Sequence, residues 1–214
     1  MTQIDYSRIN EEAFDFLADS YRRKSGKMIN PEFLVEKFSQ YLSDTFSNPN
    51  VLEIGVGSGD ILRYFSERGF RTTAIDISSR MIEVAGRKSP NTTYIHSDFL
   101  EHNFDNRRFS GIFANSVLHL FPKRRTREAF DKIYSILKEG GFFYLSIPLF
   151  NESREEVIKR GDDDYVQEFR TRYIEKDFTG LFNNSAFGLL EKSITEFVDS
   201  KGNSLSRLNA LLIK

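Results

Sequence analysis

Three closely spaced glycines give this sequence its clearest chemical signal, in the segment Glu53-Ile54-Gly55-Val56-Gly57-Ser58-Gly59. Glycines between a strand and a helix allow positive φ angles and let the backbone approach a ligand, while free N–H groups at the helix start attract a negative group. The segment therefore predicts a nucleotide-like cofactor. A dinucleotide fingerprint would place its third glycine one residue later, where this chain has the anionic Asp60. NAD is thus the weaker alternative.

An acidic residue follows each of the next two predicted strands. Asp76 lies about twenty residues after the glycine turn, where a carboxylate can accept hydrogen bonds from both hydroxyls of a ribose. Asp98 is followed by Phe99, whose ring can lie on a purine. The structural alternative is that the glycines only make a turn, Asp76 caps a helix and Asp98 begins a loop. All three features together, in this order, favour a cofactor crevice.

The elements that must position these groups alternate between strand and helix. Apolar and β-branched runs predict strands at 51–54, 72–75, 93–96, 109–114 and 142–147, and a helix before the last of them ends at Gly140-Gly141. Since parallel strands need long crossovers, the fold class is α/β, a doubly wound and mostly parallel sheet. Runs at 189–198 and 205–213, with a turn at 199–203, predict a C-terminal antiparallel hairpin that completes a seven-stranded sheet. Two amphipathic helices, around 13–17 and 33–42, predict an N-terminal helical cap over one end of the domain.

Length and composition bound the function. The 214 residues fit one domain, 1–214, divided into the cap (1–48), a cofactor-binding core (49–148), a lid or substrate segment (149–184) and the final hairpin (185–214). A net charge of -1 disfavours broad nucleic-acid binding, and the absence of cysteine excludes disulfides, thiolate chemistry and cysteine-ligated metals; no metal site is expected. With a polar start and no long apolar run, we expect a soluble, cytoplasmic protein without a membrane segment.

Four segments of the chain resemble successive motifs of the class I, Rossmann-like methyltransferases that depend on S-adenosylmethionine. The segments are 51–59, 74–78, 97–99 and 137–141, and the resemblance spans roughly residues 45 to 214. It implies that the glycines pack against the methionine part of the cofactor, that Asp76 binds the ribose and that Asp98 and Phe99 hold the adenine. The full set expected to bind S-adenosylmethionine, or its product S-adenosylhomocysteine, is Tyr21, Glu53, Gly55, Gly57, Gly59, Asp76, Ile77, Met81, Asp98, Phe99 and Asn115.

Catalysis and substrate recognition are less firmly indicated. Methyl transfer needs a nucleophile held in line with the methyl group, and a histidine of near-neutral pKa can serve as general base. His119 follows the fourth strand and is the candidate, with local packing as its alternative and a base from the lid if it does not act. In the lid, Arg170 and Arg172 are the candidate substrate-binding residues and would favour an anionic substrate, with surface salt bridges as the alternative.

The expected function is transfer of a methyl group from S-adenosylmethionine to an O or N nucleophile of a small molecule, by a protein that is a monomer or a homodimer. One alternative is an RNA or protein methyltransferase, which the basic run Lys123-Arg124-Arg125-Thr126-Arg127 would favour. Another is a protein that binds the cofactor without turnover. The identity of the substrate and the methylated atom lie beyond these patterns.

Overall fold

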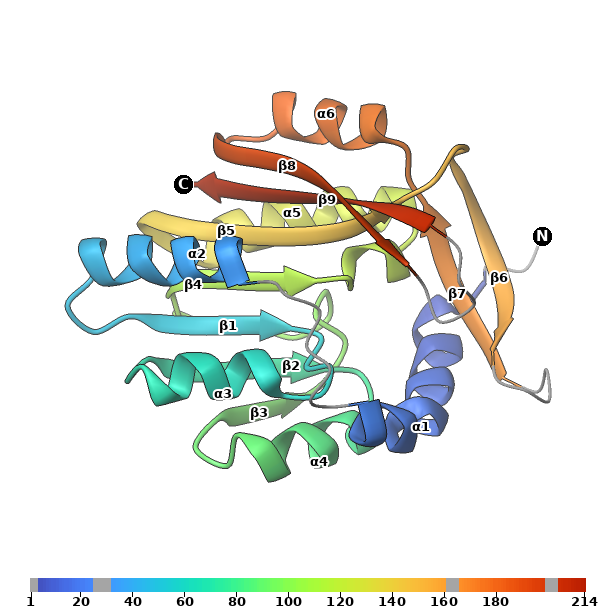
Figure 1. Cartoon of the computed structure of the whole chain (residues 1–214), viewed down its shortest axis with the longest axis horizontal. Helices are drawn as coiled ribbons and strands as arrows, with labels where there is room; N and C mark the ends of the chain where they lie inside the picture. Colours follow the sequence, from blue (N-terminus) through green and yellow to red (C-terminus); the bar gives the residue numbers. More distant parts are fainter. Residues whose placement is uncertain (1–3, 25–31, 161–165, 199–203) are drawn as a thin grey trace.

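A twisted sheet with helices on both faces forms the centre of the protein (Figure 1). The computed structural model describes residues 4–24, 32–160, 166–198 and 204–214, and these form a seven-stranded sheet in the order β3-β2-β1-β4-β5-β9-β8. Strands β1 to β5 are parallel, whereas β9 runs antiparallel to both β5 and β8. This confirms the predicted doubly wound sheet with its closing hairpin. The strand bounds are β1 Asn50–Ile54, β2 Arg71–Asp76, β3 Thr93–His96, β4 Phe109–Asn115, β5 Leu137–Leu149, β8 Gly188–Val198 and β9 Ser204–Ile213.

Aromatic side chains join the helices to the two faces of the sheet. On one face Phe38 of α2 and Phe65 of α3 pack on Phe113 of β4, with ring centroids 5.7 and 5.8 Å apart. On the other, Phe130 of α5 lies 5.6 Å from Phe143 of β5, within a cluster that includes α6. No helix in the described ranges is long and apolar enough to cross a membrane. The helices are α1 Tyr6–Lys24, α2 Glu32–Thr45, α3 Asp60–Glu67, α4 Ser79–Lys88, α5 Lys123–Ile136 and α6 Glu175–Asn183, with a short 3-10 helix, η1, at Leu118–Leu120.

Two expectations about helices need correction. Only α1 of the two N-terminal helices lies beyond the carboxyl ends of the strands, because the apolar side of α2 packs on the sheet through Phe38 and Leu42. Helix α5 ends at Ile136 rather than at Gly140-Gly141. The buried Leu137 already pairs with Phe109 of β4, so β5 begins there.

The segment expected to be a lid contains a hairpin as well as α6. Strands β6 (Arg154–Arg160) and β7 (Val166–Arg172) form a separate antiparallel two-stranded sheet (Figure 1). Asn10 of α1 fixes this hairpin, because its side chain accepts a hydrogen bond from the Phe169 N–H (2.9 Å) and donates one to the Leu120 carbonyl (3.0 Å). Asn10 therefore links α1 to both the hairpin and η1. The turn predicted at 199–203 lies outside the described residues.

Candidate functional site

One cavity, of about 950 Å³, brings the predicted cofactor residues together at the carboxyl edge of the sheet. The ends of β1, β2 and β3 form its strand-end wall, which includes Glu53, the three glycines, Asp76 and Asp98. Helix α1 covers it, and Arg160 and Glu168 of the β6–β7 hairpin form a second side, the hairpin wall. Every residue expected to bind the cofactor lines this cavity: Tyr21, Glu53, Gly55, Gly57, Gly59, Asp76, Ile77, Met81, Asp98, Phe99 and Asn115.

The glycine turn has the backbone that its residue types require. Gly55, Gly57 and Gly59 have φ angles of 76°, 49° and 80°, a region that side chains disfavour. A Cβ atom on Gly59 would lie 2.8 Å from the backbone of Ala85, so this glycine allows α3 and α4 to approach each other. A Cβ atom on Gly57 would meet nothing within 4 Å, although the residue lines the cavity. Gly57 thus borders open ligand space.

Backbone amides hold the two strand-end aspartates in place. The Asp76 carboxylate accepts hydrogen bonds from the N–H groups of Val56 and Ser78, both at 2.8 Å, and so joins the glycine turn to the start of α4. Burial raises the pKa of Asp76 to about 6. Asp98 accepts hydrogen bonds from the N–H of Leu100 (2.7 Å) and from the hydroxyl of Ser7 in α1 (2.6 Å). Both carboxylates are therefore pre-positioned at the crevice, and α1 is attached to one of them.

Glu53 is the most unusual acid of the strand-end wall. It is only 3% exposed, and its Oε2 atom has no hydrogen-bond partner among the described residues. Burial, and then the neighbouring charges of Asp76 and Asp60, raise its pKa well above the ordinary value. Such a group is stabilised by a positive ligand atom. Asp60 is different, because Lys88 lies 2.8 Å from both of its oxygens.

The structure does not support the expected properties of His119. His119 belongs to η1 and does not line the cavity. Its Nδ1 atom is buried and has no hydrogen-bond partner among the described residues. Burial, followed by the positive charges of Arg170, Arg160 and Arg207, lowers the pKa of His119 to about 3. We expected a base with a pKa near neutrality, and this environment instead makes the imidazole a weak base.

Arg170 and Arg172 also lie outside the residues that line the cavity. Their Nε atoms donate hydrogen bonds to Oε1 of Glu156 on the neighbouring strand, at 2.8 and 2.6 Å. Although burial acts in the opposite direction, hydrogen bonds from these arginines and Arg154 lower the pKa of Glu156 to about 2. The two expected substrate residues are thus engaged in a salt-bridge network within the hairpin.

Several cavity residues were not anticipated from the sequence. Ser7 and Asn10 come from α1, Arg160 and Glu168 from the hairpin, and Arg207 from β9. The available signal for the hairpin was the alternation of charged residues at Glu168, Arg170 and Arg172. It could not show which charges face the cavity, because that depends on the register between β6 and β7.

The basic run at the start of α5 is neutralised by partners in the same chain. Lys123 lies 3.2 Å from Asp177, and Arg124 lies 2.6 Å from Glu128. Arg125 pairs with Glu101, and Arg127 donates a hydrogen bond to the carbonyl of Asn184 at 3.1 Å. This run therefore does not form an open basic surface.

Comparisons with known proteins agree with this geometry. Residues 51–141 match the sequence model of a family described as a methyltransferase domain. An uncharacterized methyltransferase of Oceanobacillus iheyensis is 24% identical over 184 residues, 81% of this chain and 86% of that protein. The fold is similar to that of a SAM-dependent methyltransferase from Methanosarcina mazei, with a TM-score of 0.73 at 16% identity over 85% of this chain and 97% of that one.

A further similar structure was crystallised with ligands. The 1,6-didemethyltoxoflavin-N1-methyltransferase of Burkholderia thailandensis, bound to 1,6-didemethyltoxoflavin and S-adenosylhomocysteine, has a TM-score of 0.67 at 19% identity. The similarity covers 98% of this chain and 89% of that one. The family match to residues 51–141 spans the whole glycine turn and both strand-end aspartates, on a sheet of the same architecture. Residues 51–141 thus match a methyltransferase domain, and the fold of the chain is that of methyltransferases that depend on S-adenosylmethionine.

Proposed function

We propose that this protein transfers the methyl group of S-adenosylmethionine to an oxygen or nitrogen atom of a small molecule by in-line displacement, leaving S-adenosylhomocysteine. The cavity of about 950 Å³ at the carboxyl edge of the sheet carries this proposal. It lies at the upper end of the 300 to 1,000 Å³ range of small-molecule sites, which leaves room for an acceptor beside the cofactor. Helix α1 and the hairpin border the same space, so acceptor and cofactor would share a site partly shielded from water.

The charges of the strand-end wall suit this cofactor better than a dinucleotide. S-adenosylmethionine supplies a methyl group made electrophilic by a sulfonium, and it also carries an ammonium group. The unpartnered Oε2 atom of Glu53 would accept a hydrogen bond from that ammonium, and Asp76 retains lone pairs for the ribose hydroxyls. Asp98 and Phe99 would contact the adenine, and Tyr21 the carboxylate. A pyrophosphate would instead meet a wall of carboxylates.

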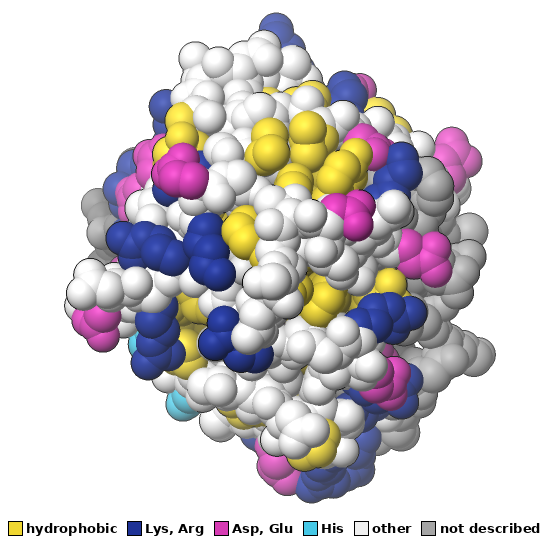
Figure 2. Space-filling view, turned by 90° about the vertical axis from the view of Figure 1, so that its left-hand side faces the viewer, with side chains coloured by type: hydrophobic (Ala, Val, Ile, Leu, Met, Phe, Trp, Pro, Cys, Tyr) yellow, Lys and Arg dark blue, Asp and Glu magenta, His cyan; other side chains and the backbone are white. Residues whose placement is uncertain are grey.

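A small acceptor fits this molecule better than a polynucleotide. The basic run 123–127 is engaged in pairs within the chain. On the face opposite the hairpin, Figure 2 shows basic side chains separated by acidic and neutral ones. Neither surface provides the continuous positive charge that phosphate backbones require. The small heterocycle named with the Burkholderia enzyme is consistent with an acceptor of this size.

The experiment that tests the proposal measures transfer of labelled methyl groups from S-adenosylmethionine. The acceptors would be a panel of phenols, N–H heterocycles and primary amines, with total RNA and a protein mixture as separate arms. Label in a small-molecule product is the expected result. Label only in RNA or protein, or no label despite tight binding of S-adenosylhomocysteine, would reject the proposed acceptor class. Tighter binding of NAD than of S-adenosylhomocysteine by calorimetry would reject the cofactor.

A further inference from the structure

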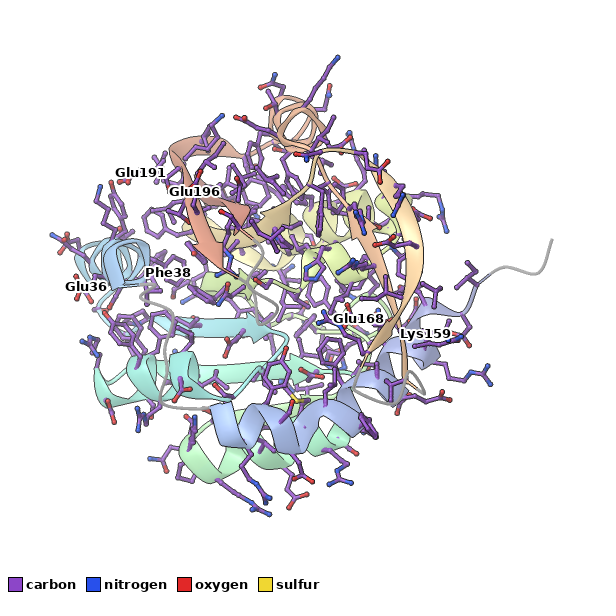
Figure 3. The ribbon with its side chains drawn as sticks, turned by 45° about the vertical axis from the view of Figure 1, so that its right-hand side comes forward. Glu36, Phe38, Lys159, Glu168, Glu191 and Glu196 are labelled. Atoms are coloured by element: carbon purple, nitrogen blue, oxygen red, sulfur yellow. The ribbon has the colours of Figure 1, made fainter. Side chains whose placement is uncertain are left out.

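Glu168 is a buried carboxylate on the hairpin wall of the cavity. Its exposed fraction is 0%, and it lines the cavity from β7. In Figure 3 it lies on the inner side of the hairpin, toward the body of the molecule. The adjacent residue, Phe169, hydrogen-bonds through its N–H to Asn10 and has its ring 5.9 Å from that of Tyr6. The backbone that carries Glu168 is therefore fixed to α1.

An arginine of the neighbouring strand binds and orients this carboxylate. Arg160 of β6 donates two hydrogen bonds to it, from Nε to Oε2 at 2.8 Å and from Nη2 to Oε1 at 3.0 Å. Each carboxylate oxygen has two acceptor positions, so each retains one that the guanidinium does not use. A buried and oriented carboxylate at a ligand cavity can accept a hydrogen bond from an O–H or N–H group and then its proton.

The other acids of the cavity have different environments. Glu53, Asp76 and Asp98 belong to the strand-end wall, which the proposed cofactor would occupy. Asp60 is paired with Lys88. His119 does not line the cavity, and its environment lowers its basicity. Among the described residues of the cavity, this leaves Glu168 as the acid that faces the space for the acceptor.

We propose that Glu168 is the catalytic base of the methyl transfer and that its acceptor is an O–H or N–H group that loses a proton on methylation. This inference rests on the function proposed above. A lone pair of the acceptor atom forms a bond to the methyl carbon, and the carbon–sulfur bond breaks with its electron pair remaining on sulfur. The acceptor proton passes to a Glu168 oxygen and later to water, so that charge and atoms balance.

The test compares Glu168→Gln with Glu156→Gln, a matched variant in the same hairpin. Glu156 also bridges arginines, but it does not line the cavity. With the best acceptor of the panel, Glu168→Gln should lower kcat at least about 100-fold, the usual size of general-base catalysis, whereas Glu156→Gln should lower it less than about threefold. Binding of S-adenosylhomocysteine, measured by calorimetry, should change less than about twofold in both, since neither touches the strand-end wall.

The dependence of rate on pH adds a readout that a purely structural role would not change. The groups that face Glu168 are Arg160 of β6 and Tyr21 of α1, and Asp76 and Arg207 line the same cavity. If Glu168 takes the proton of the acceptor, the kcat profile of the wild type should have an acidic limb. In Glu168→Gln that limb should be lost, and Glu168→Asp should restore it with a partial recovery of kcat.

Three results would overturn the assignment: a Glu168→Gln variant within threefold of wild-type kcat, an equal loss in Glu156→Gln, or an acidic limb that Glu168→Gln leaves in place. A wild-type protein that binds S-adenosylhomocysteine but methylates no member of the panel would instead reject the proposed function, and this inference with it.

Discussion

The two sides of the cavity are built in different ways. Main-chain groups set the strand-end wall: two backbone amides hold Asp76, and three glycines with positive φ shape the turn beside it. In the hairpin wall, a side-chain ion pair between Arg160 and Glu168 provides the polar groups, on strands outside the seven-stranded sheet. A main-chain site tolerates little change, whereas an inserted hairpin can be altered without disturbing the sheet. This difference in construction supports the proposal that the cofactor binds at the first wall and that the second wall selects the acceptor.

The variant Gly57→Val should have the largest effect, because it tests whether the glycine turn of the strand-end wall binds the cofactor. The new side chain would project into space where no protein atom lies within 4 Å, on a backbone with a φ of 49°. We expect affinity for S-adenosylhomocysteine to fall at least about 100-fold, because the side chain occupies the ligand's space and strains the turn. Isothermal calorimetry measures the affinity, and thermal unfolding reports whether the variant is folded.

Gly69→Val is the matched control for this variant. Gly69 has a φ of 80° and also has nothing within 4 Å of an added Cβ atom, but it lies outside the cavity. Both variants therefore carry comparable backbone strain, and only one obstructs the ligand. Equal losses of affinity in the two would mean that Gly57 acts only through the stability of the turn.

The same difference in construction explains what could be predicted from the sequence. Glu53 to Gly59, Asp76 and Asp98 each follow a short apolar strand, so local pattern was enough to place them at one edge of a parallel sheet. The strand bounds were predicted to within one or two residues, except for β5. Its start at Leu137 depends on pairing with β4, which is a contact distant in the sequence.

Long-range pairing decides the hairpin wall, and local sequence patterns carry little information about it. Arg170 and Arg172 were expected to bind substrate because they are cationic and lie in an insertion. Their side chains instead meet Glu156, fourteen and sixteen residues away, which the register of β6 and β7 places opposite Arg170 and diagonal to Arg172. Glu168 was not singled out, because a glutamate in a charged segment gives no sign of burial until α1 packs against β7.

Asp76→Asn tests whether the strand-end wall binds the ribose of the cofactor. The change replaces a charged acceptor of two ribose hydroxyls by a neutral amide, a loss of about 1.5 to 3 kcal/mol, or at least about tenfold in affinity for S-adenosylhomocysteine. The maximal rate at saturating cofactor should change much less. A variant with wild-type affinity and intact circular dichroism would remove Asp76 from the cofactor site.

Because the pKa of Asp76 is raised, cofactor affinity should depend on pH. The hydroxyls prefer the ionised carboxylate, and this carboxylate becomes protonated as the pH falls through about 6. The wild-type dissociation constant should therefore rise below pH 6, by up to about tenfold per pH unit, and Asp76→Asn should lose that contribution. Asp60→Asn serves as the control. Despite burial, the hydrogen bond from Lys88 lowers the pKa of Asp60, so its removal should leave the slope above pH 5 unchanged.

Arg170→Gln tests the corrected role of the hairpin arginines. Its guanidinium is bound to Glu156 rather than to the cavity, so the variant should bind S-adenosylhomocysteine as the wild type does and keep its KM for the acceptor within about twofold. The cost should appear in stability, at about 1 kcal/mol, since Arg172 and Arg154 still neutralise Glu156. Urea unfolding measures the stability. A large rise in acceptor KM without loss of stability would return Arg170 to the substrate site.

His119→Gln should have the smallest effect on catalysis. A base that does not line the cavity and has a pKa of about 3 cannot account for an acidic limb near neutrality, so kcat should change less than about threefold. The effect should appear in acid stability instead.

An unfolded histidine has a pKa near 6.5, so between pH 6.5 and 3 the unfolded chain binds a proton that folded His119 does not. The free energy of unfolding therefore falls as the pH drops. His119→Gln removes this contribution, and its free energy of unfolding should fall less steeply with acid, by at most about 1.4 kcal/mol per pH unit. His102, whose pKa burial also lowers, is much less buried, so His102→Gln should flatten the curve less. A 100-fold loss of kcat in His119→Gln, together with loss of a limb near pH 6 to 7, would restore this histidine as the base and transfer the catalytic role from the hairpin to η1.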